Sequence, residues 1–339
     1  MKNKSCALVC WILFFSLPAF ALEIKLSTRE VNTIPWIPIT INVDVINDSS
    51  APVEIPMVGR FSFGAGNICM NYMRKADGTK PNQKEFDYMV IMSDQAPGPW
   101  KLTTETLRPG ETRSYSYSHG KAIEPMELEY WVECNFLSDP EEYKKNNIIL
   151  DHKIFSGKIK SNVLKVQVDE PAGVDALAYN EHWKSQEQRN RLEDSRKSDY
   201  LNHLKEYPRS RYSEYLICQS NPDSSIPAFQ AKRPEEYVNT SMRQKRWTSN
   251  NEDTIQNTHE QLAFQMAVMK VLQYHPNSNC KYSKRLSAAE SFISNGSFNW
   301  ACRSLNEIIG MDAKSEVDKI IKQKANQYVD ALKSNGYCQ

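Results

Sequence analysis

The sequence lacks the short motifs by which many enzymes are recognised. It contains no His-Glu-x-x-His, no Gly-x-Ser-x-Gly and no two cysteines separated by two residues. The first motif binds zinc on a helix, the second exposes a nucleophile on a sharp turn, and the third is common in zinc and redox sites. We therefore assign no catalytic residue, no cofactor-binding residue and no metal ligand. The sequence favours a protein that is not an enzyme and uses no cofactor.

An excess of charge of one sign is also missing. The chain has 42 lysines and arginines against 41 aspartates and glutamates. A protein that binds nucleic acid needs a basic surface, because it must displace the counterions of the phosphates. This balance argues against a nucleic-acid partner.

Long hydrophobic runs are absent after the first residues. Lys2 and Lys4 precede an apolar run over 6–17, and the small-x-small pattern that ends at Ala21 follows it. These three parts are typical of a secretory signal peptide. The run is shorter than the roughly 20 residues that a transmembrane helix needs. We expect cleavage after Ala21, no transmembrane anchor, and a mature chain in the periplasm or outside a bacterial cell.

Cysteine is scarce, and the expected mature chain keeps six of the 8 cysteines, an even number. An even number in an exported protein favours disulfides. Cys69 and Cys134 are the only two in the first half, each in a predicted strand, so we predict that they pair. The other four allow three connectivities: Cys218, Cys280, Cys302 and Cys338. A Cys280–Cys302 bond is disfavoured, because a hairpin would separate these residues by about 15 Å along the helix axis.

The first half of the mature chain, residues 22–170, has the period of β-strands. Apolar residues alternate with polar ones over 37–45, 114–118, 128–136 and 164–168, and a turn lies at 107–111. This pattern resembles immunoglobulin-like domains, and the resemblance implies an antiparallel β-sandwich. Because the span exceeds about 100 residues, we expect insertions near 80–100 and 137–152.

The second half, residues 171–339, has a helical period after a boundary at 169–173. We expect a long irregular loop over about 219–255, where the sequence is polar and broken by prolines. A helix that begins near Asn257 is apolar almost all round, which predicts a place at the centre of a bundle. The last helix is expected over 315–334. The chain is thus predicted to be an α+β protein of two domains.

A helical hairpin is expected over 283–309, with its turn at 295–297. The spacing of Phe298, Ala301, Leu305 and Ile308 resembles the second helix of a tetratricopeptide repeat, although no regular 34-residue period is present. The whole layout resembles exported bacterial proteins in which a β-sandwich is followed by helical hairpins. The resemblance implies an architecture and no activity.

One basic cluster with a tryptophan stands out in the expected loop. It consists of Arg243, Lys245, Arg246 and Trp247. Such a cluster can contact an acidic partner or anionic lipid, although a solvated loop is the simpler interpretation. Trp36, Trp100 and Trp131 could line a carbohydrate-binding face, but packing in the sandwich is the favoured interpretation.

Three functions remain open from the sequence. The first is an exported binding or scaffold protein that uses sandwich loops and a helical groove to bind a protein or an envelope component. The second is a protease-inhibitor-like module. The third is a hydrolase whose catalytic residues converge from distant positions, since such sites are recognised by geometry.

Overall fold

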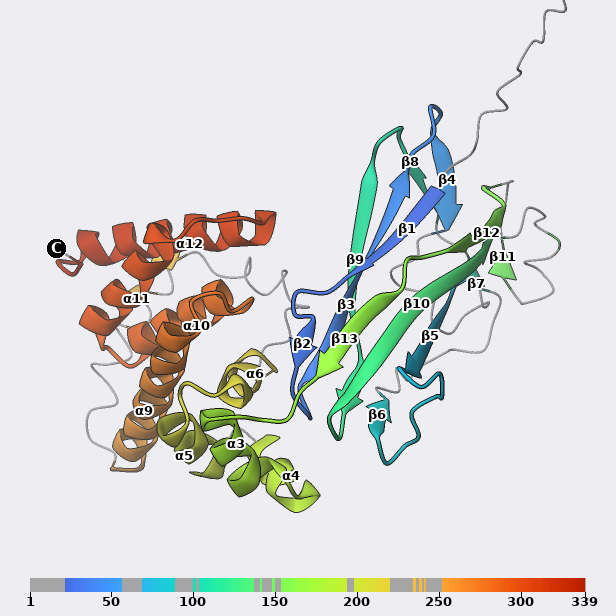
Figure 1. Cartoon of the computed structure of the whole chain (residues 1–339). Coiled ribbons are helices and arrows are strands. Elements are labelled where there is room, and N and C mark those ends of the chain that lie inside the picture. Colours follow the sequence, from blue (N-terminus) through green and yellow to red (C-terminus); the bar gives the residue numbers. More distant parts are fainter. Residues whose placement is uncertain are drawn as a thin grey trace, which may run out of the picture. The chain divides into compact units, whose positions relative to one another are not determined.

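The computed structural model shows an α+β protein (Figure 1). The chain divides into two compact units, Met1–Glu170 and Pro171–Gln339, which we call the β unit and the helical unit. Within the described residues, no helix is both long and apolar enough to span a membrane. The structure describes residues 22–56, 69–88, 100–101, 104–136, 141, 148–149, 154–193, 198–219, 234–235, 238–239, 241 and 252–338.

One sheet of the β unit has four antiparallel strands in the order β1-β3-β9-β6. The strands are β1 (Leu22–Ser27), β3 (Pro38–Asn47), β9 (Thr112–Ala122) and β6 (Phe86–Tyr88). The predicted strands over 37–45 and 114–118 lie in β3 and β9, except that β3 begins one residue later, at Pro38. Pro38 begins β3, a position where its missing N–H costs little.

The second sheet is built around β10 (Met126–Phe136), in the order β12-β10-β13-β2. Along one edge, β10 pairs first with β13 (Leu164–Val168) and then with β12 (Gly157–Lys160). Along the other edge it pairs with β5 (Cys69–Lys75). All three pairings are antiparallel, whereas β2 (Asn32–Thr33) pairs with β13 in parallel.

Two short pairs complete the described strands of the β unit. One is the antiparallel pair of β4 (Val53–Pro56) and β8 (Thr104–Leu107). The other is the parallel pair of β7 (Trp100–Lys101) and β11 (Ile148–Ile149). Most of the predicted insertions near 80–100 and 137–152 lie outside the described residues.

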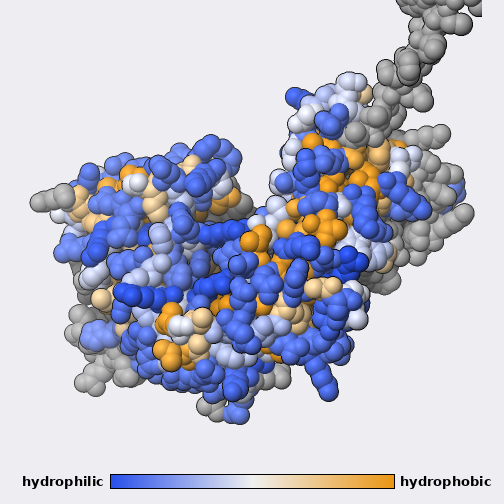
Figure 2. Space-filling model, viewed as in Figure 1, coloured by the Kyte–Doolittle hydropathy of each residue, from blue (hydrophilic) through white to orange (hydrophobic). Residues whose placement is uncertain are grey.

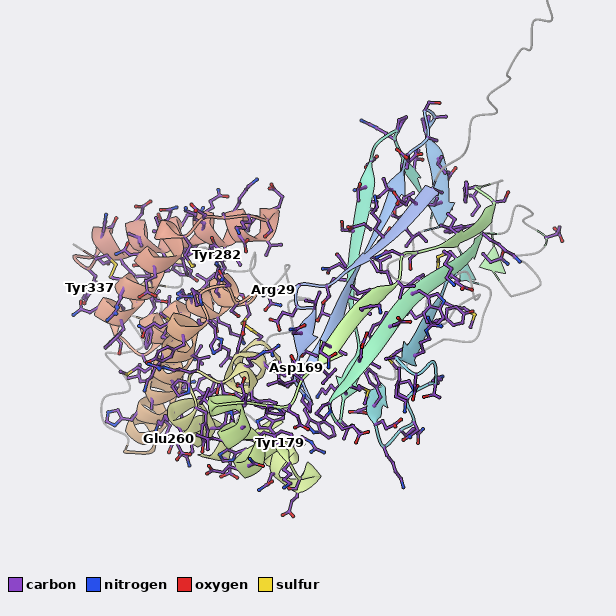
Figure 3. The ribbon with its side chains drawn as sticks, in the orientation of Figure 1. Arg29, Asp169, Tyr179, Glu260, Tyr282 and Tyr337 are labelled. Atoms are coloured by element: carbon purple, nitrogen blue, oxygen red, sulfur yellow. A yellow bond between two sulfur atoms is a disulfide. The ribbon has the colours of Figure 1, made fainter. Side chains whose placement is uncertain are left out.

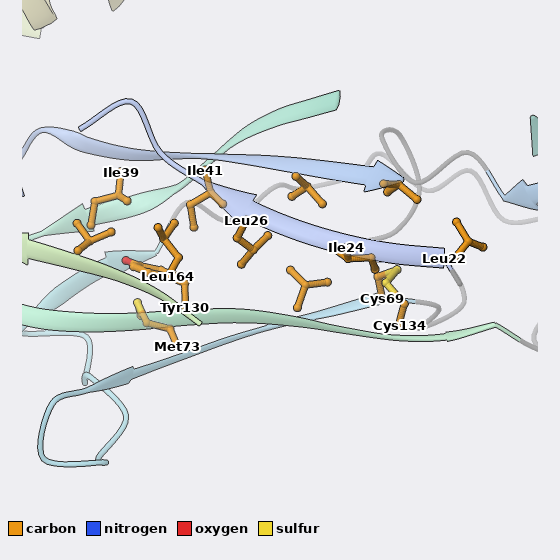
Figure 4. Packing of buried hydrophobic residues seen from close by; sticks show 14 of the residues in the cluster. Leu22, Ile24, Leu26, Ile39, Ile41, Cys69, Met73, Tyr130, Cys134 and Leu164 are labelled. Atoms are coloured by element: carbon orange, nitrogen blue, oxygen red, sulfur yellow. A yellow bond between two sulfur atoms is a disulfide. The ribbon is translucent and has the colours of Figure 1, made fainter. Parts of the chain in front are cut away.

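The inward residues of both main sheets share one hydrophobic core (Figure 4). Ile41 and Val45 of β3 and Leu128 of β10 are fully buried, and Val132 of β10 is 1% exposed. The two residues named in each strand are four positions apart, and residues an even number of positions apart point to the same face of a sheet. Burial of each such side chain stabilises the unit by roughly 1.5–3 kcal/mol. The apolar positions of the alternating pattern in the sequence therefore form the core that the two sheets share.

The first part of the helical unit contains short helices. They are α3 (Val174–Ala178), the π-helical turn η1 (Tyr179–Trp183), α4 (Gln186–Glu193), α5 (Ser198–Glu206) and α6 (Arg211–Gln219). Ala178 and Trp183 are buried, as expected for an apolar stripe, but Leu177 is 63% exposed. Leu177 and Ala178 are neighbours in α3 and point about 100° apart around the helix axis, so the orientation that buries Ala178 leaves Leu177 facing solvent.

The second part contains four longer helices. They are α9 (Glu252–Tyr274), α10 (Lys281–Ser294), α11 (Phe298–Gly310) and α12 (Glu316–Ser334). Helices α10 and α11 form the predicted hairpin, and Gly296 in its turn has a φ of 68°, which a residue without Cβ adopts at little cost. Helix α9 contacts α5, α6 and α10, so it joins the two groups of helices.

The prediction of an irregular loop over 219–255 is wrong in part. Gln219 still belongs to α6, and α9 begins at Glu252, five residues before the predicted start. Residues 234–235, 238–239 and 241 are also helical. Val238 is fully buried in the core formed by α10, α11 and α12. The sequence did not indicate these helical residues, because a single buried valine in a polar segment carries no periodic signal.

Three disulfides stabilise the described chain. Cys69 is bonded to Cys134, the predicted partner, and the two residues face each other across β5 and β10. In the helical unit, Cys218 is bonded to Cys280 and Cys302 to Cys338. The two bonds link the end of α6 to the start of α10, and α11 to the segment after α12. The disfavoured Cys280–Cys302 bond is not formed.

Candidate ligand-binding groove

A groove of about 420 Å³ opens on the helical unit between α9, α10 and α11. Ligand sites in proteins commonly have volumes of about 300–1,000 Å³. Figure 2 shows a mostly hydrophilic face on this unit, interrupted by small hydrophobic patches. The groove is lined by Lys205, Ala263, Met266, Ala267, Met269, Lys270, Gln273, Phe292, Trp300, Arg303, Ser304 and Glu307.

Helix α9 forms one side of the groove because its apolar residues exceed what its core contacts can cover. Val271 and Leu272 are fully buried, and Ala267 is 5% exposed. Met266, however, is 46% exposed and Met269 is half-buried, and both line the groove. The prediction that this helix is enclosed at the centre of a bundle is therefore wrong for the face that carries Met266.

The opposite wall comes from the α10–α11 hairpin. Phe292 of α10 and Trp300 of α11 lie with their ring centroids 6.2 Å apart. Phe292 is buried, whereas Trp300 keeps 43% of its surface exposed. The Ser304 hydroxyl donates a hydrogen bond to the carbonyl oxygen of Arg285 over 2.8 Å, which satisfies this buried hydroxyl within the hairpin. The wall thus presents an aromatic surface that is only partly covered.

The charged rim of the groove is mainly positive. The one carboxylate among the described lining residues belongs to Glu307, and it pairs with Arg285 over 3.1 Å and with Arg303 over 3.4 Å. Arg303 also lies 5.6 Å from the centroid of the Trp300 ring, within the range of a cation–π contact. In the described part of the chain, neither Lys205 nor Lys270 forms an ion pair. Two ammonium groups therefore remain available to an anionic ligand.

The residues singled out from the sequence do not form this groove. The cluster Arg243, Lys245, Arg246 and Trp247 lies outside the described residues. Trp131 lies on the outer face of β10, where its ring stacks on Tyr72 at 5.3 Å. Arg74 and Lys160 contact the same ring at 5.3 Å and 5.2 Å. These neighbours cover Trp131, so it is not a bare platform for a sugar ring.

The described histidines do not form a hydrolytic triad. Nδ1 of His275 lies 3.2 Å from a carboxylate oxygen of Glu214, and His259 is exposed on α9. Among the described residues, no serine hydroxyl is hydrogen-bonded to a histidine. A nucleophile activated by an imidazole needs such a bond. The geometry therefore gives the hydrolase hypothesis no support in this part of the chain.

Comparisons with known proteins do not assign the groove to a family. No protein-family model matches the sequence, and no curated protein is significantly similar to it. The function has to be inferred from the groove itself. The sequence signal for the groove was the excess of apolar residues over 262–272. We interpreted this excess as a helix buried on all sides, because the sequence does not place the neighbouring helices.

Proposed function

We propose that this chain is an exported, non-catalytic binding protein whose helical unit binds an acidic protein segment through one large apolar side chain. In this proposal the β unit is an immunoglobulin-like sandwich and the helical unit is built from repeat-like hairpins. The observation that carries the proposal is the groove beside Trp300, with its apolar lining and its cationic rim.

A protein segment suits the groove better than a small molecule does. Small ligands are commonly buried over 70–90% of their surface. Met266 and Trp300 remain nearly half exposed on the rim, so a small molecule that contacts them would stay partly exposed to water. Tryptophan and arginine are among the residues enriched at the positions that dominate protein–protein binding energy. Methionine adapts to apolar side chains of different shape. An apolar side chain of the partner would lie between α9 and Trp300.

The charges of the rim favour an acidic partner. Lys205, Lys270 and Arg303 outnumber Glu307, whose carboxylate already contacts two arginines. Carboxylates flanking the apolar anchor would approach the two free ammonium groups, and a basic segment would be repelled. Because these lysines lie at the surface, the attraction would weaken as salt shortens the Debye length from about 10 Å at 0.1 M to 3 Å at 1 M.

The compartment in the proposal follows from two observations. The first 21 residues have the pattern of a secretory signal, and three disulfides are present in the described chain. Disulfides persist in the periplasm and outside the cell. In such a compartment the two disulfides of the helical unit stay oxidised. The partner protein is therefore expected in the same compartment.

A peptide array tests the proposal. We would display 12-residue peptides that contain glutamates and one phenylalanine or leucine, with matched peptides in which lysine or glutamine replaces each glutamate. Binding would be measured by calorimetry at 0.1 M and 1 M salt. We expect binding of acidic peptides only, at least tenfold weaker at high salt. Trp300→Ala and Met266→Glu should abolish it.

Ile320→Glu is the matched control. Ile320 is 48% exposed on α12 and does not line the groove, so its change should leave binding unaltered. The proposal fails if acidic and basic peptides bind equally, if no peptide binds, or if Met266→Glu and Ile320→Glu have the same effect. Binding of dodecanoate without binding of any peptide would instead indicate a small anionic amphiphile.

A further inference from the structure

A π-helical turn places acidic and imidazole groups together elsewhere on the helical unit. The turn η1 begins at Tyr179, labelled in Figure 3, and the N–H of Lys184 donates to the carbonyl of Tyr179 over 2.9 Å. This i→i+5 bond marks the wider turn. π-turns are rare and often occur at functional sites, so the residues of η1 are of interest beyond packing.

Three side chains converge at this turn. Glu181 and His182 lie on η1, and Glu206 is the last residue of α5. Their ligand atoms all lie within 4.8 Å of one another. Nε2 of His182 lies 3.6 Å from Oε1 of Glu181, too far for a hydrogen bond. Two ligands at about 2.0–2.1 Å from a tetrahedral ion stand about 3.3 Å apart, close to this separation.

A buried histidine behind the three residues is a second, independent observation. His203 is fully buried, and neither of its ring nitrogens has a hydrogen-bond partner in the described part of the chain. Its ring lies 5.0 Å from that of His182 and 5.5 Å from that of Tyr207. A buried polar group left unpaired costs about 1–3 kcal/mol. Packing alone would be served better by phenylalanine, so an imidazole here points to a site.

The second carboxylate oxygen of Glu181 is held from outside the cluster. The Tyr207 hydroxyl donates a hydrogen bond to Oε2 of Glu181. This bond fixes the carboxylate and leaves Oε1 directed toward His182. Hydrogen bonds from a second layer of residues orient the ligands of metal sites in this way. Tyr207 is therefore a positioning residue.

We propose that Glu181, His182 and Glu206 bind a divalent transition-metal ion of the zinc type, with one coordination position open to solvent. An imidazole ligand favours zinc, copper or nickel, whereas calcium and magnesium favour oxygen ligands alone. Glu181 and Glu206 are exposed, so an ion reaches them from solution. This proposal is independent of the peptide groove.

Calorimetry with zinc chloride on the full chain, after treatment with EDTA and dialysis, tests the site. We expect one zinc ion per chain, and at least tenfold weaker binding in Glu206→Gln and His182→Gln. Tyr207→Phe should weaken binding about tenfold, the lower end of what second-layer changes cost. Cobalt should give the strong visible absorption of a four-coordinate ion in the wild type and lose it in His182→Gln.

The matched control is the double variant His259→Gln with Glu260→Gln. These residues form an exposed His-Glu pair on α9, so the change should leave zinc binding intact. Circular dichroism in EDTA would verify that each variant is folded, and Glu206→Gln is the safest because its side chain is exposed. Zinc binding that is absent in the wild type, equal in all variants, or lost in the control variant would overturn the proposal.

Discussion

The β unit and the helical unit close similar loops with disulfides, but the bonds join different kinds of neighbour. Cys69 and Cys134 are direct partners across β5 and β10, with their Cα atoms 4.0 Å apart. Cys218 and Cys280 join two helix ends that share no backbone pairing, at 5.5 Å. In the β unit the bond repeats what the sheet already specifies. In the helical unit it links segments that no backbone pairing holds together.

The two units also differ in the kind of polar side chain that they bury. On the β unit, Arg74 pairs with Glu129 on the outer face of the sheet, and the buried polar side chains are neutral ones such as Asn47 and Ser49, which are hydrogen-bonded. The helical unit buries His203, Arg285 and Ser304. Buried polar groups reduce stability unless they are paired. Both candidate sites lie in the helical unit, which buries the ionisable side chains of His203 and Arg285.

The largest expected effect comes from removing the disulfides. Cys69→Ser with Cys134→Ser, and Cys218→Ser with Cys280→Ser, open loops with separations of 65 and 62 residues. Because loop entropy in the unfolded state dominates, each pair of changes should destabilise its own unit by about 4 kcal/mol. Hydrogen exchange in urea, resolved by peptide, would measure each unit separately.

The Cys302→Ser with Cys338→Ser variant supplies the control, since its separation is 36 residues. It should cost about 0.5 kcal/mol less than the other two. If the free energy of unfolding of the β unit fell by less than half as much as that of the helical unit, strand pairing and not loop entropy would determine the effect of removing a disulfide.

The second prediction concerns acid. Burial, followed by the nearby charge of His182, lowers the pKa of His203 from 6.5 to about 3. The unfolded imidazole takes up a proton below about pH 6.5, while the buried one stays neutral down to about pH 3. The unfolded state therefore binds more protons in this window, and the helical unit should lose about 2 kcal/mol between pH 7.5 and pH 5.

The β unit should resist the same change of pH. Hydrogen bonds from Arg74 and Lys165 lower the pKa of Glu129, and Lys160 and Trp131 do so for Glu133. The stabilisation that these carboxylates give is present above about pH 4.5 and is lost only as pH falls further. Urea unfolding in EDTA at each pH would test this contrast. His203→Phe should flatten the slope of the helical unit alone, and an unchanged slope would contradict the assignment.

Much of the β unit was predictable because strands carry their own signal. Ile41, Val43 and Val45 alternate with polar residues, and alternate burial follows from the pleat of the strand. The predicted pair Cys69–Cys134 needed only that each cysteine lie in a strand. What the alternation did not show is strand order, because pairing depends on contacts between residues far apart in the sequence.

The candidate sites were not predictable for a related reason. Glu181 and Glu206 are separated by α4 and most of α5, and their approach depends on a π-turn that no residue pattern announces. The groove needs Met266 and Trp300 on different helices to face one space. The apolar excess over 262–272 was visible, but only the placement of α10 and α11 distinguishes an open groove from a core.

The third prediction compares one Arg–Glu pair in each unit. Arg285 is 7% exposed and pairs with Glu307, whereas the side chain of Arg74 is 47% exposed beside Glu129. Glu307→Gln should destabilise the helical unit by about 2 kcal/mol, because it leaves a buried guanidinium without its counter-charge. Glu129→Gln should cost much less, and its effect should disappear in 1 M salt. Equal losses in urea titrations would contradict this contrast.

The smallest expected effect lies at the start of α12, where a capping box stabilises the first turn of the helix. The Ser315 hydroxyl accepts a hydrogen bond from the N–H of Asp318, and the Asp318 carboxylate accepts one from the N–H of Ser315. Ser315→Ala removes this capping box and should cost about 1 kcal/mol. Ser334→Ala, at the exposed end of the same helix, is the control and should have almost no effect, because its hydroxyl only adds a bond to a carbonyl already within the helix. A loss above 2 kcal/mol in Ser315→Ala would mean that the cap, and not the buried face with Tyr328 and Leu332, holds α12 in place.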